Sequence, residues 1–89
     1  MTIEGAIIKE QGITFGIIIV KKFAMSSTSE ADKTRRSFQS NFAEFQGIPL
    51  ILASQDSRGR FEYQGKRDIV DFLASIDASR IPWTKYTYS

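Results

Sequence analysis

The sequence predicts a single α+β domain, residues 1–89, in which two helices pack on one mixed sheet of four or five strands. Its 89 residues contain two pairs of short strand-like segments, and a segment with helical apolar spacing follows each pair. A chain of this length buries enough surface for one core and not for two. The expected order is strand, strand, helix, strand, strand, helix, and then an edge strand or a mobile arm at residues 83–89. A ferredoxin-like and a thioredoxin-like arrangement are the two alternatives.

The first pair of strands is a β-hairpin. Residues 3–10 alternate loosely, Gln11 and Gly12 form a tight turn, and residues 13–20 are apolar on both faces. A strand that is apolar on both faces is covered on both sides, so we expect it in the centre of the sheet. Its cover is either one helix on each face or a helix and a partner subunit.

A helix follows this hairpin and opens at Glu30. Ser27 and Glu30 have the spacing of a capping box, and Gly47 marks the end of the helix. The core stripe of this helix, at positions i, i+4 and i+7, consists of Phe38, Phe42 and Phe45. A crossover of this length favours parallel placement of the second and third strands, while hairpin partners are antiparallel, which makes the sheet mixed.

The charged side of the first helix is typical of a solvated flank rather than a phosphate patch. Asp32 and Arg36 stand four residues apart in the order that suits an ion pair. The basic residues Lys33, Arg35 and Arg36 are therefore expected to lie in solvent.

The second half of the chain repeats the pattern of hairpin and helix. Residues 50–53 are apolar on both faces and predict another interior strand. The run Asp56-Ser57-Arg58-Gly59 has the composition of a β-turn, and Ser54 and Ser57 are expected to serve it by hydrogen bonding. Residues 61–63 alternate like a short strand that closes the hairpin.

The last helix carries its apolar stripe over residues 69–76. It should end by residues 78–80, because Pro82 restricts the residue before it to extended geometry. Beyond Pro82 the chain alternates again and favours a strand, which its terminal position makes an edge strand or an arm.

Composition excludes most familiar catalytic devices. The chain has no Cys and no His, so it cannot form a disulfide, a thiolate nucleophile, a Cys/His zinc site or an imidazole base. Lys and Arg number 12 against 10 Asp and Glu, and a net charge of +2 is small for a protein that must neutralise several phosphates. The longest apolar run is too short to cross a membrane, and the N-terminus lacks a basic leader, so we expect a cytoplasmic protein.

Two groups of residues are candidates for binding. The first is an anion or ligand site around the glycine-containing turns, where a helix start offers free N–H groups; it consists of Asp56, Arg58, Arg60, Lys66 and Arg67. The four cations need not form one patch, because the fourth strand separates them by about 10 Å at roughly 3.3 Å per residue. The second is an interaction surface on the aromatic tail; it consists of Trp83, Tyr86 and Tyr88. Turn formation and edge-strand packing are the plainer interpretations of the two groups.

One stretch of the sequence resembles the C-terminal half of thioredoxin-like domains. The resemblance rests on Gly47-Ile48-Pro49-Leu50-Ile51-Leu52, on Phe61-Glu62-Tyr63, on Gly65, and on Ile69, Phe72, Leu73 and Ile76. It implies that Pro49 takes the place of the family's cis-proline. Thioredoxin activity is excluded, because disulfide exchange needs a pair of cysteines. Taken whole, with residues 55–59 and 81–83, the chain is similar to short uncharacterised bacterial proteins, a resemblance that implies no function.

We therefore expect a small non-catalytic domain that binds no cofactor and self-associates, as a homodimer, or binds a protein partner. The reason is a surplus of apolar strand faces over helices to cover them. The first alternative is a nucleic-acid or anion-binding module. The second is a carboxylate-dependent or metal-dependent enzyme that uses Asp56 or Glu62.

Overall fold

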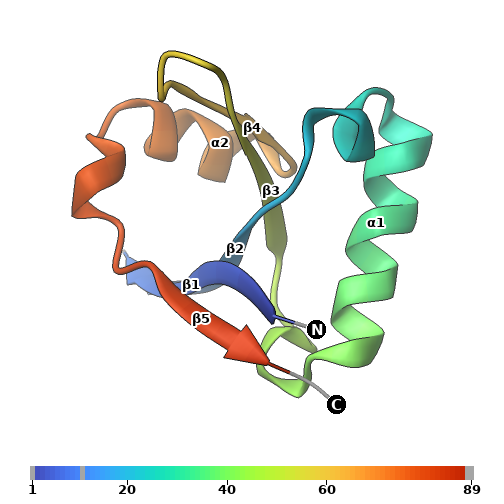
Figure 1. The fold of residues 1–89 in the computed structure, drawn as a ribbon. Helices are drawn as coiled ribbons and strands as arrows, with labels where there is room; N and C mark the ends of the chain where they lie inside the picture. The colour runs from blue at the N-terminus through green and yellow to red at the C-terminus, as the bar shows by residue number, and fades with distance from the viewer. Residues whose placement is uncertain (1, 11, 88–89) are drawn as a thin grey trace.

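A computed structural model, which describes residues 2–10 and 12–87, shows a mixed sheet with one helix on each face (Figure 1). The strands are β1 (Thr2–Glu10), β2 (Ile13–Ile19), β3 (Leu50–Gln55), β4 (Phe61–Gln64) and β5 (Thr84–Thr87). The helices are α1 (Thr28–Asn41) and α2 (Arg67–Ala74), and the 3₁₀ turns are η1 (Lys22–Met25), η2 (Ala43–Phe45) and η3 (Ala78–Arg80). The predicted α+β class and the predicted order of strands and helices are confirmed.

The sheet has the order β4-β3-β2-β1-β5. Strands β2 and β3 are parallel neighbours, with Ile17 opposite Ile51, and the other three pairings are antiparallel. The two strands that are apolar on both faces thus lie in the interior of the sheet, as predicted. The ferredoxin-like alternative is wrong, because its split βαβ unit has another strand between the two that α1 connects here.

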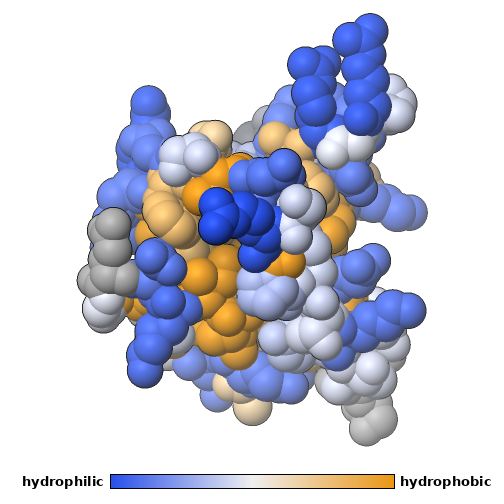
Figure 2. Space-filling model, turned by 90° about the vertical axis from the view of Figure 1, so that its left-hand side faces the viewer, coloured by the Kyte–Doolittle hydropathy of each residue, from blue (hydrophilic) through white to orange (hydrophobic). Residues whose placement is uncertain are grey.

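Each face of the sheet carries its own core. On the α1 face the buried side chains are Ile3, Ile18, Ala31, Phe42, Phe45, Leu50 and Leu52. On the α2 face they are Ala6, Phe15, Ile17, Ile51, Ala53, Ile69, Leu73 and Ile81. The chain therefore supplies a helix for each face, the first of the two arrangements that the sequence left open. Figure 2 shows that apolar surface remains visible on the side of the molecule where η3 and the β1–β2 turn lie.

Helix α1 begins at the predicted cap and ends earlier than predicted. The Ser27 hydroxyl accepts a hydrogen bond from the Glu30 N–H at 3.1 Å. The helix stops at Asn41, because Phe42 adopts an extended backbone, and the chain continues as η2 rather than running on to Gly47. This break lets Phe42 and Phe45 both reach the core, with their ring centroids 6.3 Å apart.

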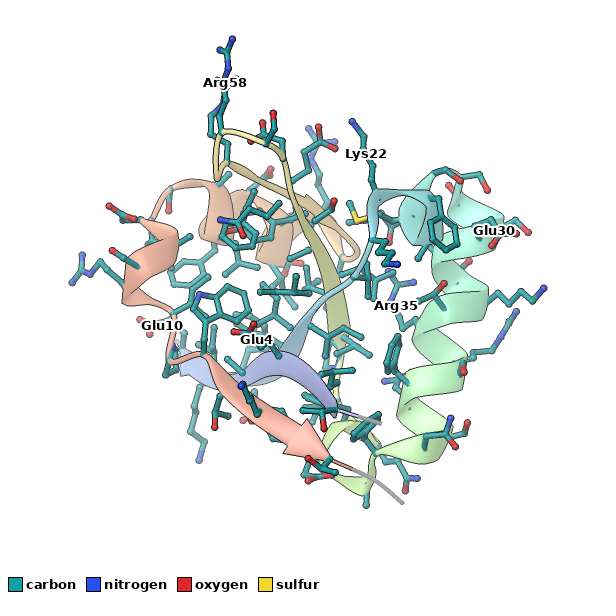
Figure 3. The ribbon with its side chains drawn as sticks, viewed as in Figure 1. Glu4, Glu10, Lys22, Glu30, Arg35 and Arg58 are labelled. Atoms are coloured by element: carbon teal, nitrogen blue, oxygen red, sulfur yellow. The ribbon has the colours of Figure 1, made fainter. Side chains whose placement is uncertain are left out.

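Arg35 corrects the prediction of a solvated basic flank on α1. Its guanidinium, and not that of Arg36, pairs with Asp32, at 2.6 Å from Nη1 to Oδ1. Nε donates to the carbonyl of Leu50 at 2.7 Å, and Nη2 donates to the carbonyl and side-chain oxygens of Gln64. The Arg35 side chain is only 17% exposed, on the side of α1 that faces the sheet (Figure 3). One side chain thus ties α1 to β3 and β4.

The tail forms the edge strand rather than a mobile arm over the residues that are described. Residues 84–87 pair with β1, and Thr87 lies opposite Thr2. Before it, α2 ends at Ala74, and the predicted helix end at residues 78–80 is a separate turn, η3. The peptide bond that precedes Pro49 is trans, which differs from the cis-proline that the thioredoxin resemblance implies.

Replacement of Arg35 by Lys should lower the free energy of unfolding by about 2 kcal/mol. Lysine keeps the charge but cannot reproduce the planar fork that reaches Asp32, Leu50 and Gln64 together, so partly buried acceptors lose a charge-assisted donor. Urea denaturation measures the change. The matched control is Arg36→Lys, because Arg36 is exposed on the same helix and its replacement should change stability by less than about 0.5 kcal/mol. Equal stabilities of the two variants would contradict this role of Arg35.

Candidate functional site

Asp56, the first residue of the predicted anion site, organises the β3–β4 turn. Its Oδ1 accepts hydrogen bonds from the N–H groups of Arg58 at 2.8 Å and Arg60 at 2.9 Å. Gly59 supplies the positive φ of +80° that the turn requires. The Arg58 side chain extends away from the body of the protein (Figure 3), and Arg60 Nε lies 3.6 Å from Asp56 Oδ2. The carboxylate is therefore already occupied by its own turn.

These contacts lower the pKa of Asp56. The largest cause is the hydrogen bond from the Arg60 N–H, and the Arg58 N–H and the positive charges of Arg60 and Lys22 act in the same direction. The carboxyl group thus stays ionised in more acidic solution than a free aspartate does.

The other two predicted cations lie at the opposite end of β4. Lys66 and Arg67 follow this strand, at the N-terminus of α2, whereas Arg58 and Arg60 precede it. Arg67 pairs with Asp71 one turn along the helix, at 3.3 Å. The structure therefore separates the predicted anion site into two groups, as the length of the strand suggested.

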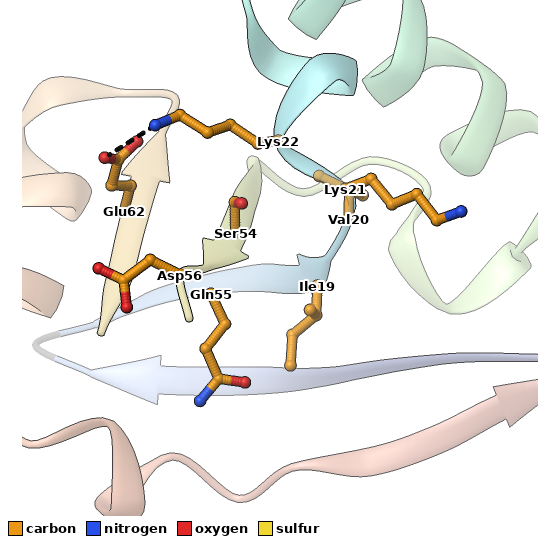
Figure 4. Close-up of a pocket in the computed structure, with 8 residues that line it drawn as sticks. All are labelled: Ile19, Val20, Lys21, Lys22, Ser54, Gln55, Asp56 and Glu62. Atoms are coloured by element: carbon orange, nitrogen blue, oxygen red, sulfur yellow. Dashed lines mark ion pairs between the residues drawn. The ribbon is translucent and has the colours of Figure 1, made fainter. Parts of the chain in front are cut away.

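A hollow of about 460 Å³ lies where β2 and β3 end side by side (Figure 4). From this point the chain leaves β2 for α1 on one face, and leaves β3, through β4, for α2 on the other. Crevices outside the carboxyl ends of neighbouring parallel strands, where the connections diverge, are where open α/β sheets bind ligands. This hollow, which we call the end pocket, is lined by Ile19, Val20, Lys21, Lys22, Ser54, Gln55, Asp56 and Glu62.

Ser54 faces the end pocket and does not serve the turn, contrary to the prediction. It is 5% exposed and is the buried polar residue of the described core. Within residues 2–10 and 12–87, no hydrogen bond involves its hydroxyl oxygen. Figure 4 shows this hydroxyl on the side where Lys22 and Glu62 meet, with 3.6 Å between Nζ and Oε1. Lys22 was not a candidate, because nothing in its local sequence links it to Ser54 or Glu62.

A second feature is an apolar strip between the β1–β2 hairpin and the α2 side. Its members, which we call the apolar strip, are Ile8, Ile13, Phe72 and Ile76. Two adjoining hollows of about 100 and 340 Å³ lie along it and share Glu10 and Phe72. The orange surface in Figure 2 lies on this side of the molecule. Ile13 is among the most exposed large apolar side chains that the structure describes.

The aromatic tail packs onto both faces of the sheet. Trp83 stacks on Phe61 with ring centroids 5.5 Å apart, and its indole N–H donates to the carbonyl of Ala78 at 3.1 Å. The ring centroid of Tyr86 lies 5.0 Å from that of Phe45 in the other core, and burial there raises the pKa of Tyr86. Tyr88 lies outside the described residues. Trp83 and Tyr86 are thus packed against different cores and do not share one surface.

The acidic residues of the described chain form no group of three or more that could hold a metal ion. In residues 2–10 and 12–87, the helices are all too short or too polar to cross a membrane. No family model matches the chain, and the comparisons with curated proteins and with solved structures found no significant match either.

Replacement of Asp56 by Asn should flatten the acid dependence of stability. Because the pKa of Asp56 is lowered by folding, its carboxylate stabilises the protein above about pH 3.8, and this stabilisation disappears as the pH falls through the folded-state pKa. Asparagine keeps an oxygen acceptor for the turn but does not titrate. Urea midpoints measured between pH 2 and pH 7 should fall less steeply with acid for this variant, and parallel curves would contradict the assignment. Asp77→Asn should act in the same way, because Ser79 lowers the pKa of that carboxyl.

Proposed function

We propose that this chain is a small non-catalytic domain that forms a homodimer through the apolar strip. The supporting observation is the shortness of α2. Its eight residues span about 12 Å, whereas the nine-residue β1 spans about 30 Å, so the helix leaves part of its face uncovered. Ile13 is exposed and the other side chains of the strip are half-buried, and a contiguous, partly exposed apolar surface of this kind is typical of an interface.

The charges beside the strip suit a second copy of the same chain. Glu10 at the end of β1 and Arg80 in η3 line the same hollow, and within the described residues neither makes an ion pair. A two-fold axis through the strip would place Glu10 of one protomer against Arg80 of the other, twice. Self-complementary pairing of this kind is the rule for symmetric dimers.

The alternative of phosphate or nucleic-acid binding has less support. Its four cations are divided between the two ends of β4, and two of them, Arg60 and Arg67, already face a carboxylate at 3.6 and 3.3 Å. The enzyme alternative is weakened, because the Asp56 carboxylate that it would use already accepts the hydrogen bonds of the β3–β4 turn. A cytoplasmic location stays a prediction from the sequence.

Replacement of Ile13 by Glu should convert the dimer to a monomer, because it places a charge at the exposed apolar side chain of the strip. Ile7→Glu is the matched control. Ile7 is 39% exposed and Ile13 is 40% exposed, but Ile7 lies between Ala6 and Ile8 on β1 and therefore points to the opposite face of the same hairpin. Sedimentation velocity over micromolar to submillimolar concentrations measures the mass of each variant.

We expect the wild type and Ile7→Glu to sediment as dimers and Ile13→Glu to dissociate at least about tenfold more readily. A wild-type protein that remains monomeric over the whole range would overturn the proposal. Equal self-association of the two variants would also overturn it, because the interface would then lie elsewhere.

A further inference from the structure

An exposed aromatic ring lies in η1, between β2 and α1. Phe23 is 70% exposed and is the most exposed large apolar side chain of the described residues. It packs against neither core, and within residues 2–10 and 12–87 its ring contacts no other aromatic ring. The favourable free energy of burying this ring is therefore still available to a binding partner.

Hydrogen bonds fix the backbone of η1 on both sides of this ring. The Ala24 N–H donates to the Lys21 carbonyl at 3.0 Å. The Ser26 N–H donates to the Phe23 carbonyl at 3.3 Å. From α1, the Thr34 hydroxyl donates to the Ala24 carbonyl at 3.0 Å. A turn that is already ordered loses little conformational entropy when its exposed side chain binds a partner.

Basic side chains project at the same end of the molecule as η1. Lys21 and Lys22 directly precede the ring in the sequence, and their side chains extend in opposite directions (Figure 4). The β3–β4 turn lies at this end too, and Figure 3 shows Arg58 and Lys22 both extending outward from it. The Arg60 side chain, on the same turn, is 72% exposed. We call this surface the basic end; it consists of Phe23, Lys21, Lys22, Arg58 and Arg60.

The two carboxylates that line the end pocket do not cancel the charge of these four cations. Asp56 accepts hydrogen bonds from two N–H groups of its own turn. Glu62 forms an exposed pair with Lys22, at 3.6 Å, and exposed pairs of this kind open readily. The basic end therefore complements a partner that has negative charges at its surface and an apolar layer directly below them.

An anionic lipid bilayer is the partner that this arrangement favours. A second copy of the chain does not suit the basic end, because a two-fold contact there would bring like charges together. Single-stranded nucleic acid stacks its bases on several rings, whereas the aromatic rings other than Phe23 are at least half-buried among the described residues. A bilayer accepts a single inserted ring, and its flat surface extends to both sides of that ring, where Lys21 and Lys22 reach.

We propose that the basic end binds the surface of an anionic lipid bilayer. Phe23 enters the boundary between the headgroups and the acyl chains, and the four cations contact lipid phosphates. Binding is weak and reversible, because one ring and a few cations supply less than a stable membrane anchor requires. Ile13 begins β2 and η1 follows its other end, so the apolar strip stays free for a second copy of the chain.

The first experiment measures how much of the full chain sediments with large unilamellar vesicles, at lipid concentrations up to about 5 mM. One set of vesicles is pure phosphatidylcholine, and the other contains equal parts of phosphatidylcholine and phosphatidylserine. The partition coefficient should be at least about tenfold larger for the anionic vesicles, since each cation near such a surface adds to binding. The difference should shrink in concentrated salt, which screens the attraction.

The second experiment places the contact at the basic end. Phe23→Ala should lower the partition coefficient for anionic vesicles about tenfold, because it removes the inserted ring. The double variant Lys21→Gln with Lys22→Gln should lower it at least about fivefold, because it removes two cations. Both variants should keep the melting temperature of the wild type, since Phe23 packs against neither core and the pair of Lys22 with Glu62 is exposed.

Two matched controls remove the same kinds of group elsewhere. Ile7→Ala removes apolar surface from a side chain that is 39% exposed on β1. The double variant Lys9→Gln with Lys85→Gln removes two exposed charges on β1 and β5 and therefore gives the same net charge as the lysine variant of η1. Both controls should bind anionic vesicles within about twofold of the wild type, because charges farther than a Debye length are screened.

Four results would overturn the proposal. Anionic vesicles bind no more protein than neutral ones, or Phe23→Ala binds like the wild type, or the two double lysine variants lose the same affinity, which would make net charge the cause. The fourth is tighter binding, dependent on Phe23, to a single-stranded oligonucleotide of mixed sequence, which would make the basic end a nucleic-acid site. Because the apolar strip consists of other residues, failure here leaves the dimer proposal to its own test.

Discussion

The parallel pairing of β2 with β3 is the constraint on which the rest of the structure depends. Parallel neighbours need a crossover, and α1 supplies it on one face. Because both strands are apolar on both sides, the other face also needs a cover, and α2 returns there after β4. The same pairing brings the carboxyl ends of the two strands together and so creates the end pocket.

Much of this fold is readable from local patterns, and the parts that are not depend on contacts between distant residues. The order of elements, the interior strands and the Ser27 cap follow from turn chemistry, apolar spacing and capping rules. Helical spacing places both Arg35 and Arg36 near Asp32, and the choice between them depends on which side of α1 meets the sheet. The early end of α1 likewise depends on distant contacts, because it allows both Phe42 and Phe45 to be buried in the core.

The candidate sites divide in the same way. Composition marked the turn at Asp56 and the basic residues near it, and the length of β4 already indicated that the cations would separate. Lys22, Ser54 and Glu62 come together only through the pairing of β2, β3 and β4, so no local motif could connect them. The sequence did not indicate the apolar strip, because its residues have the spacing expected of core residues. They are left uncovered because α2 is short.

The pairing of β1 with β5 has a consequence for how the protein is made. Strand β1 can pair with β2 as soon as the hairpin has emerged, but its other edge has no partner until residues 84–87 are synthesised. Until then, β1 has an open edge that can pair with a strand of another chain. The β1–β5 contacts join residues that are more than 75 positions apart in the sequence, and non-local contacts of this kind slow folding.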